Sequence, residues 1–240
     1  MARVFKILLF APAIVALCIF AASCGSSSST AQYRVVQAIP DAPGNFDVSV
    51  NGKNVFTNVA FGSTEPTFGY QSVPVGSDPI EVTQASASVI NSTSMNLISG
   101  TQSTALLTGL YSDPAAFILR DNNTAPPSGQ AELRIVYASP SAPASLDVYI
   151  VSPGIDITQR DPTISALQFG QQSAYQYLTT QKSGNAQITV IVTESGDPTK
   201  AQLVNQTYTI SVGQIRTLVL VDAIGGGAIS SIPLELSDLN

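Results

Sequence analysis

A block of sequence occurs twice in this chain, at an offset of one hundred residues. Residues 34–43 read Arg-Val-Val-Gln-Ala-Ile-Pro-Asp-Ala-Pro, and residues 134–143 read Arg-Ile-Val-Tyr-Ala-Ser-Pro-Ser-Ala-Pro. Further matches follow in the same order, and a late one pairs Thr104 with Thr217. Each copy has roughly a hundred residues, which is a common size for one hydrophobic core. The duplication therefore predicts two domains of one fold.

Apolar and polar residues alternate along both copies, as in the run from Phe46 to Val50. Period-two alternation with β-branched residues is typical of strands that are buried on one face. Such runs lie at residues 33–38, 46–50, 80–83, 104–110 and 116–119, and again at 132–137, 188–193, 207–211, 216–221 and 229–236. Gly, Pro, Asn and Ser separate them at short intervals. The sequence predicts an all-β protein of two tandem antiparallel β-sandwich-like domains, of the immunoglobulin or transthyretin kind.

The second copy is longer than the first at one place. After its second strand the first copy has Asn51-Gly52, which predicts a two-residue type I′ hairpin. The second copy has residues 152–163 there, with Asp156, Arg160 and Asp161. We expect this segment to project beyond the sheet edge and to be the best candidate for contact with a partner. A tolerated surface insertion is the alternative.

The first residues resemble an export signal. Arg3 and Lys6 precede an apolar run over residues 7–22, followed by Ser23 and Cys24. Small residues before a cysteine resemble the bacterial lipobox, in which Cys24 would be acylated and become the first residue of the mature chain. Gly25 directly after the cysteine resembles the pattern found in lipoproteins that are sent to the outer membrane. An ordinary signal peptide or an uncleaved anchor is the alternative.

The expected organisation follows from these observations. Residues 1–23 form a lipoprotein signal peptide, 24–31 a flexible tether, 32–121 the first β-domain, 122–130 a linker rich in Asn, Pro and Ser, and 131–240 the second β-domain. Removal of the signal leaves 8 basic against 16 acidic residues and no free thiol. An acidic surface repels phosphate backbones, so nucleic acid is not expected as a partner.

The repeated block also resembles a known family. Arg-Val-Val-x-Ala-x-Pro-Asp-Ala-Pro, then Asp-Val-x-Val-Asn-Gly and Asn-Val-Ala-Phe-Gly, are similar to the bacterial domain of unknown function 4397. Residues 33–120 look like one copy and residues 131–236 like another. The resemblance implies an all-β, secreted or lipid-anchored protein without an agreed activity. The family often places His before the Ala-Ser-Pro stretch, whereas Gln37 and Tyr137 stand there in this chain.

The residue types restrict the possible chemistry. The chain has no histidine, which removes the usual general base and most zinc sites, and no serine lies in a Gly-x-Ser-x-Gly elbow. Two carboxylates alone can hydrolyse glycosides, but the chain has no Trp to stack on a sugar. Asp121-Asn122-Asn123 could bind calcium, although solvated linker polarity explains it better. Residues 225–227, three glycines, predict a flexible turn. No cofactor or metal is expected.

Eight residues of the repeated block are predicted to have a structural role. They are Arg34, Pro40, Pro43 and Asp47 in the first copy, and Arg134, Pro140, Pro143 and Asp147 in the second. Each Asp begins a strand just after a Pro-x-Ala-Pro turn and alternates with apolar neighbours. We expect each Asp to accept hydrogen bonds from its own turn or to pair with the arginine of its own copy.

These features favour one function over another. The sequence predicts an exported, lipid-anchored protein of the cell envelope, at the outer membrane, that acts as a non-catalytic binding or structural module. Its partners would be the membrane, through the lipid anchor, and an envelope protein or glycan. The alternative is a carboxylate-based envelope hydrolase. A cleft that holds two carboxylates within about 5–10 Å of each other would favour the hydrolase.

Overall fold

The computed structural model describes residues 29–75, 80–92, 97–180 and 184–239. Within these ranges the chain forms strands, turns and loops and no helix, so the all-β prediction is confirmed. The predicted signal peptide and Cys24 lie outside the described residues. The chain forms two halves, each built from two β-sheets that face each other across a core.

The first half contains sheets A and B. Sheet A consists of β1 (Thr30–Gln37), β4 (Thr64–Glu65), β5 (Gln71–Pro74), β8 (Gln102–Leu110) and β9 (Asp113–Arg120). Sheet B consists of β2 (Phe46–Val50), β3 (Lys53–Val59), β6 (Ile80–Gln84) and β7 (Ala87–Ser92). Phe46, Val48 and Val50 point into the core between the two sheets, as the alternation predicts.

The second half contains sheets C and D, with the same arrangement. Sheet C consists of β10 (Gln130–Tyr137), β13 (Gln176–Thr179), β16 (Ile215–Leu220) and β17 (Leu234–Leu239). Sheet D consists of β11 (Ser145–Val151), β12 (Ile164–Gln168), β14 (Asn185–Glu194) and β15 (Gln202–Ser211). The order β13-β10-β16-β17 matches β5-β1-β8-β9, and β12-β11-β14-β15 matches β3-β2-β6-β7.

Two details of the predicted strands are corrected. The sheets are antiparallel except that β1 pairs with β8, and β10 with β16, in parallel. These partners are the first and a late strand of each half, so a long connection carries the chain back to the same end. The strand predicted at residues 229–236 begins only at Leu234. Ile229 makes an isolated bridge with Asp222, and Ile232 lies in a turn-rich segment where it is exposed.

The hairpin prediction is confirmed. Asn51 and Gly52 have φ angles of 55° and 69°, the two left-handed conformations that a type I′ turn requires. They join β2 to β3, with Val50 opposite Lys53.

Residues 152–163 occupy the equivalent place in the second half and fold back over the outer face of sheet D. Ile157 is buried against Tyr149 and Ile191 on that face. The Lys200 ammonium donates hydrogen bonds to the carbonyl oxygens of Ile157 (2.9 Å) and Arg160 (2.6 Å). The segment therefore covers part of the sheet face instead of only extending from its edge. Most of it stays exposed, and contact with a partner stays a prediction.

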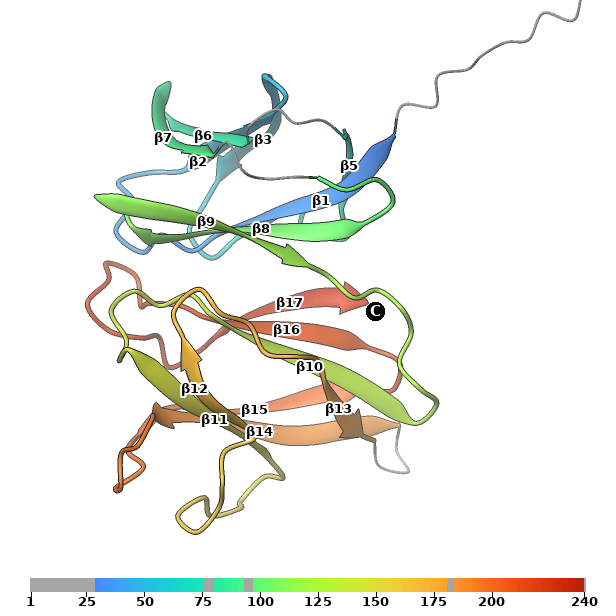
Figure 1. Cartoon of the computed structure of the whole chain (residues 1–240), viewed down its shortest axis with the longest axis vertical. Coiled ribbons are helices and arrows are strands. Elements are labelled where there is room, and N and C mark those ends of the chain that lie inside the picture. Colours follow the sequence, from blue (N-terminus) through green and yellow to red (C-terminus); the bar gives the residue numbers. More distant parts are fainter. Residues whose placement is uncertain (1–28, 76–79, 93–96, 181–183, 240) are drawn as a thin grey trace, which may run out of the picture.

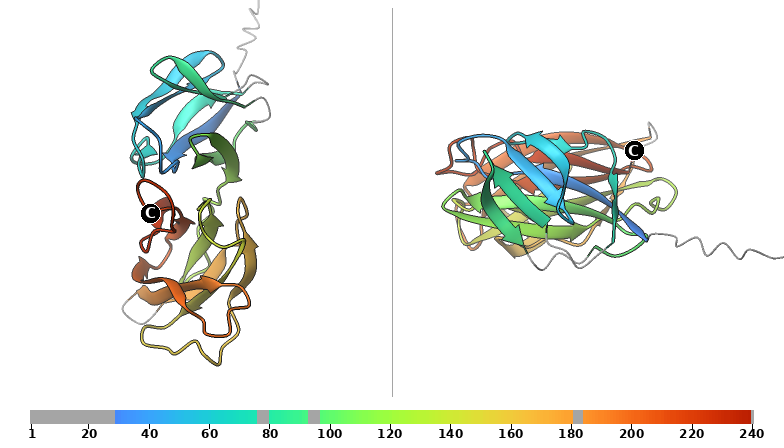
Figure 2. Two further views of the ribbon diagram at one scale, coloured as in Figure 1. Left: turned by 90° about the vertical axis from the view of Figure 1, so that its left-hand side faces the viewer. Right: turned by 90° about the horizontal axis from the view of Figure 1, so that it is seen from above.

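The two halves are stacked, so the molecule has four layers in the order B, A, C, D (Figure 1; Figure 2). Sheets A and C meet through their outer faces, which form a third apolar cluster. This cluster consists of Val36, Ala38, Leu106, Leu119, Val136, Ala138, Val219, Val221, Leu234 and Leu236. β1 and β10 are therefore buried on both faces along nearly their whole length, including their arginines.

The strand directions define two sides of this stack. The side on which β1 and β10 begin, with Thr30 and Gln130, is called the tether side, because the chain enters there from residue 29 (Figure 1). The side on which they end, at the two Pro-x-Ala-Pro turns, is called the motif side. Each strand has eight residues, which at about 3.3 Å per residue separates the two sides by roughly 26 Å.

Candidate functional site

The arginine of each repeated block lies at the contact between the two halves. Alternation along β1 places Tyr33 and Val35 in the first core and Arg34 on the opposite face, with Val36, against sheet C. β10 places Arg134 on the face toward sheet A in the same way. The two guanidinium groups meet Asp121, which follows β9, and Asp238 in β17. These four residues are called the buried quartet.

Arg34 is held from both halves. Its Nε donates to Thr104 Oγ1 of its own half at 2.7 Å, and its Nη1 donates to the carbonyl oxygen of Ser237 at 2.7 Å. Its Nη2 makes a close ion pair with Asp238 and a longer contact, 3.4 Å, with Asp121 Oδ2. The Tyr70 ring lies below the guanidinium, with its centroid 4.8 Å from Cζ.

Arg134 repeats this arrangement from the other side. Its Nε donates to Thr217 Oγ1 at 2.9 Å, and its Nη1 donates to the carbonyl oxygen of Arg120 at 3.0 Å. Its Nη2 pairs with Asp121 Oδ1 at 2.6 Å and lies 3.5 Å from Asp238 Oδ2. The Tyr175 ring lies 4.8 Å from its Cζ.

The quartet therefore has approximate two-fold symmetry. Each arginine binds a threonine and a tyrosine of its own half, and its shortest ion pair is with the aspartate of the other half. Each tyrosine hydroxyl also donates to the aspartate of its own half, Tyr70 to Asp121 and Tyr175 to Asp238, both at 2.9 Å. An interface in which the same groups are contributed from both sides has the geometry of an isologous dimer contact.

Burial dominates the electrostatics of the quartet. The side chains of Asp121 and Asp238 have no solvent exposure. Burial raises the pKa of the Asp121 carboxyl and Asp238 raises it further, whereas the two arginines act in the opposite direction. Burial alone would lower the pKa of Arg34, but the two carboxylates outweigh it and the pKa is raised. Two positive and two negative groups balance, and their hydrogen bonds offset the cost of desolvation.

Two sequence predictions are wrong here. Asp121 was expected in a solvated run of linker residues, but it is the centre of the buried quartet. Arg34 and Arg134 do not pair with Asp47 and Asp147, because alternation along β1 and β10 turns them toward the interface between the halves. Within the described ranges no group of three His, Cys, Asp or Glu residues could hold a metal ion.

Asp47 and Asp147 instead hold bulges in the neighbouring strand. Asp47 Oδ1 accepts from the backbone N–H of Asn58 at 2.8 Å, and Asp147 Oδ1 accepts from that of Ala166 at 2.9 Å. Asn58 and Ala166 both have positive φ, 60° and 51°, where the strand register shifts. Asp147 also accepts from Ser195 Oγ at 2.7 Å. The carboxylates stabilise an irregular strand and not the proline turn.

The prolines of the repeated blocks come together on the motif side. A loop between β16 and β17 lies between the two turns, where Gly225 N–H donates to the Pro40 carbonyl at 2.9 Å and Gly227 N–H donates to Ser141 Oγ at 3.1 Å. At its base the buried Asp222 accepts from the Ser139 hydroxyl and, at 3.3 Å, from the Ser141 N–H. The three glycines, predicted as a flexible turn, thus bridge the two halves.

Gln37 and Tyr137, near the end of β1 and β10, each hold one of these turns. Gln37 Oε1 accepts from the Ile39 N–H at 2.6 Å, and the Tyr137 hydroxyl donates to the Pro143 carbonyl. Burial and the nearby Asp222 raise the pKa of Tyr137 to about 12, so the phenol remains a donor at neutral pH.

A groove on the motif side lies beside the turns. It has a volume of about 300 Å³ and is lined by Gly109, Leu110, Asp113, Ala115, Pro140 and Phe169. Residues of both halves line it, so it exists only when the halves are joined. Ile224, in the glycine loop close by, has 85% of its surface exposed. The turns, the glycine loop and this groove form the candidate functional site.

The sequence found some members of these sites and missed others. Thr104 and Thr217 were paired in the repeat, but Tyr70, Tyr175 and Asp238 carried no motif. Asp121 and Asp238 are 117 residues apart, whereas the two arginines are 100 residues apart. Insertions in the second copy therefore hid the match between the two aspartates. A scan for residue types shared at the end of each copy could have found the two aspartates.

Fold and site together define an all-β protein with two joined sandwiches and a composite surface on one side. Within the described ranges no helix is long and apolar enough to cross a bilayer. Residues 31–149 match the model of one family, described as Domain of unknown function (DUF4397). The match covers nearly all of the first half and continues through β10 into β11, which supports the resemblance of the repeated block. The chain matches none of the curated proteins.

Proposed function

We propose that this protein is a lipid-anchored component of the cell envelope, built from two copies of the DUF4397 domain and acting as a non-catalytic binding module. The equivalent strand orders of the two halves support the two copies, and the match over residues 31–149 supports the family. Cys24 and the basic and apolar residues before it support export and acylation, and Gly25 supports transfer to the outer membrane. The partner would be an envelope protein or glycan.

One observation carries the binding function. The two repeated turns lie far apart in sequence, yet the structure brings both to the side opposite the tether, joined by the glycine loop. A loop site on a rigid scaffold is a common arrangement for recognition. Ile224 is exposed there, beside a groove that both halves line. The motif side is therefore the surface that an anchored protein presents away from its membrane.

The buried quartet supports a binding role over hydrolysis. Asp121 and Asp238 are two carboxylates that lie near each other, since both contact the same two guanidinium groups. A glycosidase pair must reach the scissile bond of its substrate. Here both carboxylates are buried, each pairs with two guanidinium groups and each accepts a tyrosine hydroxyl. This pair joins the two halves, and both carboxylates are closed off from solvent.

Site-specific crosslinking in intact cells tests the binding function. A photoreactive residue in place of Ile224 should give a discrete adduct with an envelope protein or glycan. The matched control is Phe68, which is equally exposed, 85%, and lies in the β4–β5 loop. Adducts at both positions to the same extent, or at neither, would contradict a binding surface on the motif side.

The anchor is tested separately. Because Cys24 is the only cysteine left after the expected cleavage, Cys24→Ala should abolish acyl labelling. The variant should then leave the membrane fraction or remain unprocessed. Unchanged labelling and fractionation would refute the lipoprotein assignment while leaving the crosslinking result to stand alone.

A further inference from the structure

Large apolar side chains are exposed on the tether side of the first half. The loop before β8 is bound to the start of β1, because Gly100 N–H donates to the Thr30 carbonyl at 3.0 Å and Gln32 N–H donates to the Thr101 carbonyl at 2.9 Å. Ile98 lies in this loop with 45% of its surface exposed. The residue at which the tether ends and this exposed isoleucine are thus close neighbours.

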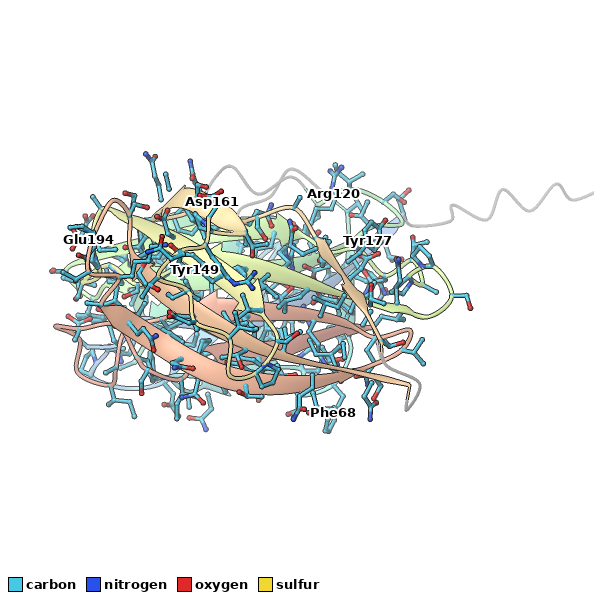
Figure 3. The ribbon with its side chains drawn as sticks, turned by 90° about the horizontal axis from the view of Figure 1, so that it is seen from below. Phe68, Arg120, Tyr149, Asp161, Tyr177 and Glu194 are labelled. Carbon is cyan, nitrogen blue, oxygen red and sulfur yellow. The ribbon has the colours of Figure 1, made fainter. Side chains whose placement is uncertain are left out.

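The second half exposes apolar side chains on the same side. Val212 is 45% exposed in the turn before β16, where the next residue, Gly213, donates its N–H to the Gln130 carbonyl at 2.8 Å. Tyr177 is 63% exposed in β13 and pairs with Glu132 near the start of β10. Figure 3 shows Tyr177 on the side from which the N-terminal chain leaves and Glu194 at the opposite end. The tether side therefore exposes apolar side chains in both halves.

The exposed carboxylates at the strand ends follow the opposite distribution. Asp41, Asp113 and Glu194 are exposed and lie on the motif side, in or beside the turns there. The linker between the halves, which runs along the tether side, consists of uncharged residues from 122 to 129. Anionic lipid headgroups repel carboxylates, so a bilayer favours the tether side over the motif side.

The length of the tether limits how far the stack can be from lipid. Five residues separate Cys24 from Thr30, all of them Gly or Ser. Such a segment spans at most about 18 Å when fully extended and about 12 Å on average. The tether is therefore shorter than the distance between the tether side and the motif side. The anchored protein consequently has little freedom to turn its motif side toward the membrane.

We propose that the tether side of the stack rests on the bilayer surface, with Ile98, Tyr177 and Val212 in contact with the lipid. The inference builds on the proposed lipid anchor at Cys24. Tyrosine is favoured at the membrane interface, where its ring contacts apolar groups and its hydroxyl stays hydrated. The contact fixes the orientation of the stack, so that both proline turns and the groove beside them face away from the membrane.

The orientation is tested with the acylated protein in vesicles of phosphatidylethanolamine and phosphatidylglycerol. Since acylation consumes Cys24, single variants Ile98→Cys, Tyr177→Cys, Val212→Cys and Ile224→Cys each carry one thiol for a fluorophore. Lipids with a nitroxide on the headgroup should quench the label at the first three positions and leave the label at the fourth unquenched. Equal quenching at all four, or quenching only at the fourth, overturns the proposal.

Two further measurements separate this inference from the anchor. Flotation shows whether the protein is bound at all: failure to float refutes the anchor and this orientation together, whereas flotation without quenching refutes the orientation alone. Adding Ile98→Ser and Val212→Ser to the Tyr177→Cys protein should reduce quenching while flotation persists. Phe68→Ser removes an exposed side chain away from the tether side and should leave the quenching of the Tyr177→Cys label unchanged. If Phe68→Ser reduces quenching by the same amount, the proposal is also overturned.

Discussion

Removing one carboxylate of the buried quartet should destabilise the whole protein. In Asp121→Ala, Thr104 loses an acceptor at 2.5 Å, Arg134 loses one at 2.6 Å and the Tyr70 hydroxyl loses one at 2.9 Å. Two guanidinium groups then share one carboxylate, which leaves an uncompensated positive charge at a site without solvent exposure. Breaking a buried pair in this way costs about 3–5 kcal/mol.

Urea denaturation followed by tyrosine fluorescence measures this loss. The control is Glu235→Ala, which removes a 45%-exposed carboxylate 3.3 Å from Arg216 and should cost less than about 1 kcal/mol. The approximate symmetry predicts that Asp238→Ala costs as much as Asp121→Ala. If Asp121→Ala costs no more than Glu235→Ala, the quartet does not hold the halves together.

A double variant sharpens the test. Asp121→Ala with Arg134→Met leaves one guanidinium and one carboxylate, so the charges balance again. The loss should be smaller than the sum of the two single losses, with a coupling of about 0.5–3 kcal/mol. Additive losses would contradict the view that charge imbalance causes the damage.

Three further changes test other contacts. Gly170→Ala should lower the urea midpoint more than Gly52→Ala. Both glycines have positive φ, so alanine costs about 1–2 kcal/mol at either position. A Cβ at residue 170 would also lie 2.9 Å from the Phe117 ring, whereas a Cβ at residue 52 would meet nothing. Tyr137→Phe removes the hydroxyl that binds the second turn and should cost about 0.5–1.5 kcal/mol in the same assay. The Ala201 N–H, the Thr199 hydroxyl and the Thr199 N–H donate to Asp197 and lower its pKa below the ordinary aspartate value. The Asp197 carboxylate should support the β14–β15 hairpin fully above the ordinary aspartate pKa, and this support should be lost as the pH falls through the lowered pKa. An NMR titration of the loop amides measures the pKa. An ordinary carboxyl pKa for Asp197 would refute the contact.

The sequence alone determined the elements of the fold. Alternation placed Val48 and Val190 in the two cores, and Asn51-Gly52 fixed a hairpin, because side-chain direction and turn type depend on residues that are neighbours in sequence. The sequence predicted the ends of strands less well where apolar residues belong to a loop, as they do before Leu234. The repeat also showed that one arrangement occurs twice.

Only the tertiary structure decided what the repeated residues do. Arg34 and Arg134 lie a hundred residues apart, and nothing local shows that both turn toward Asp121 and Asp238. Their role depends on two sheets meeting face to face. Only that contact surrounds each buried charge with opposite charges, which offset its cost of desolvation. The same contact brings the two proline turns to one side and creates the groove that neither half has alone.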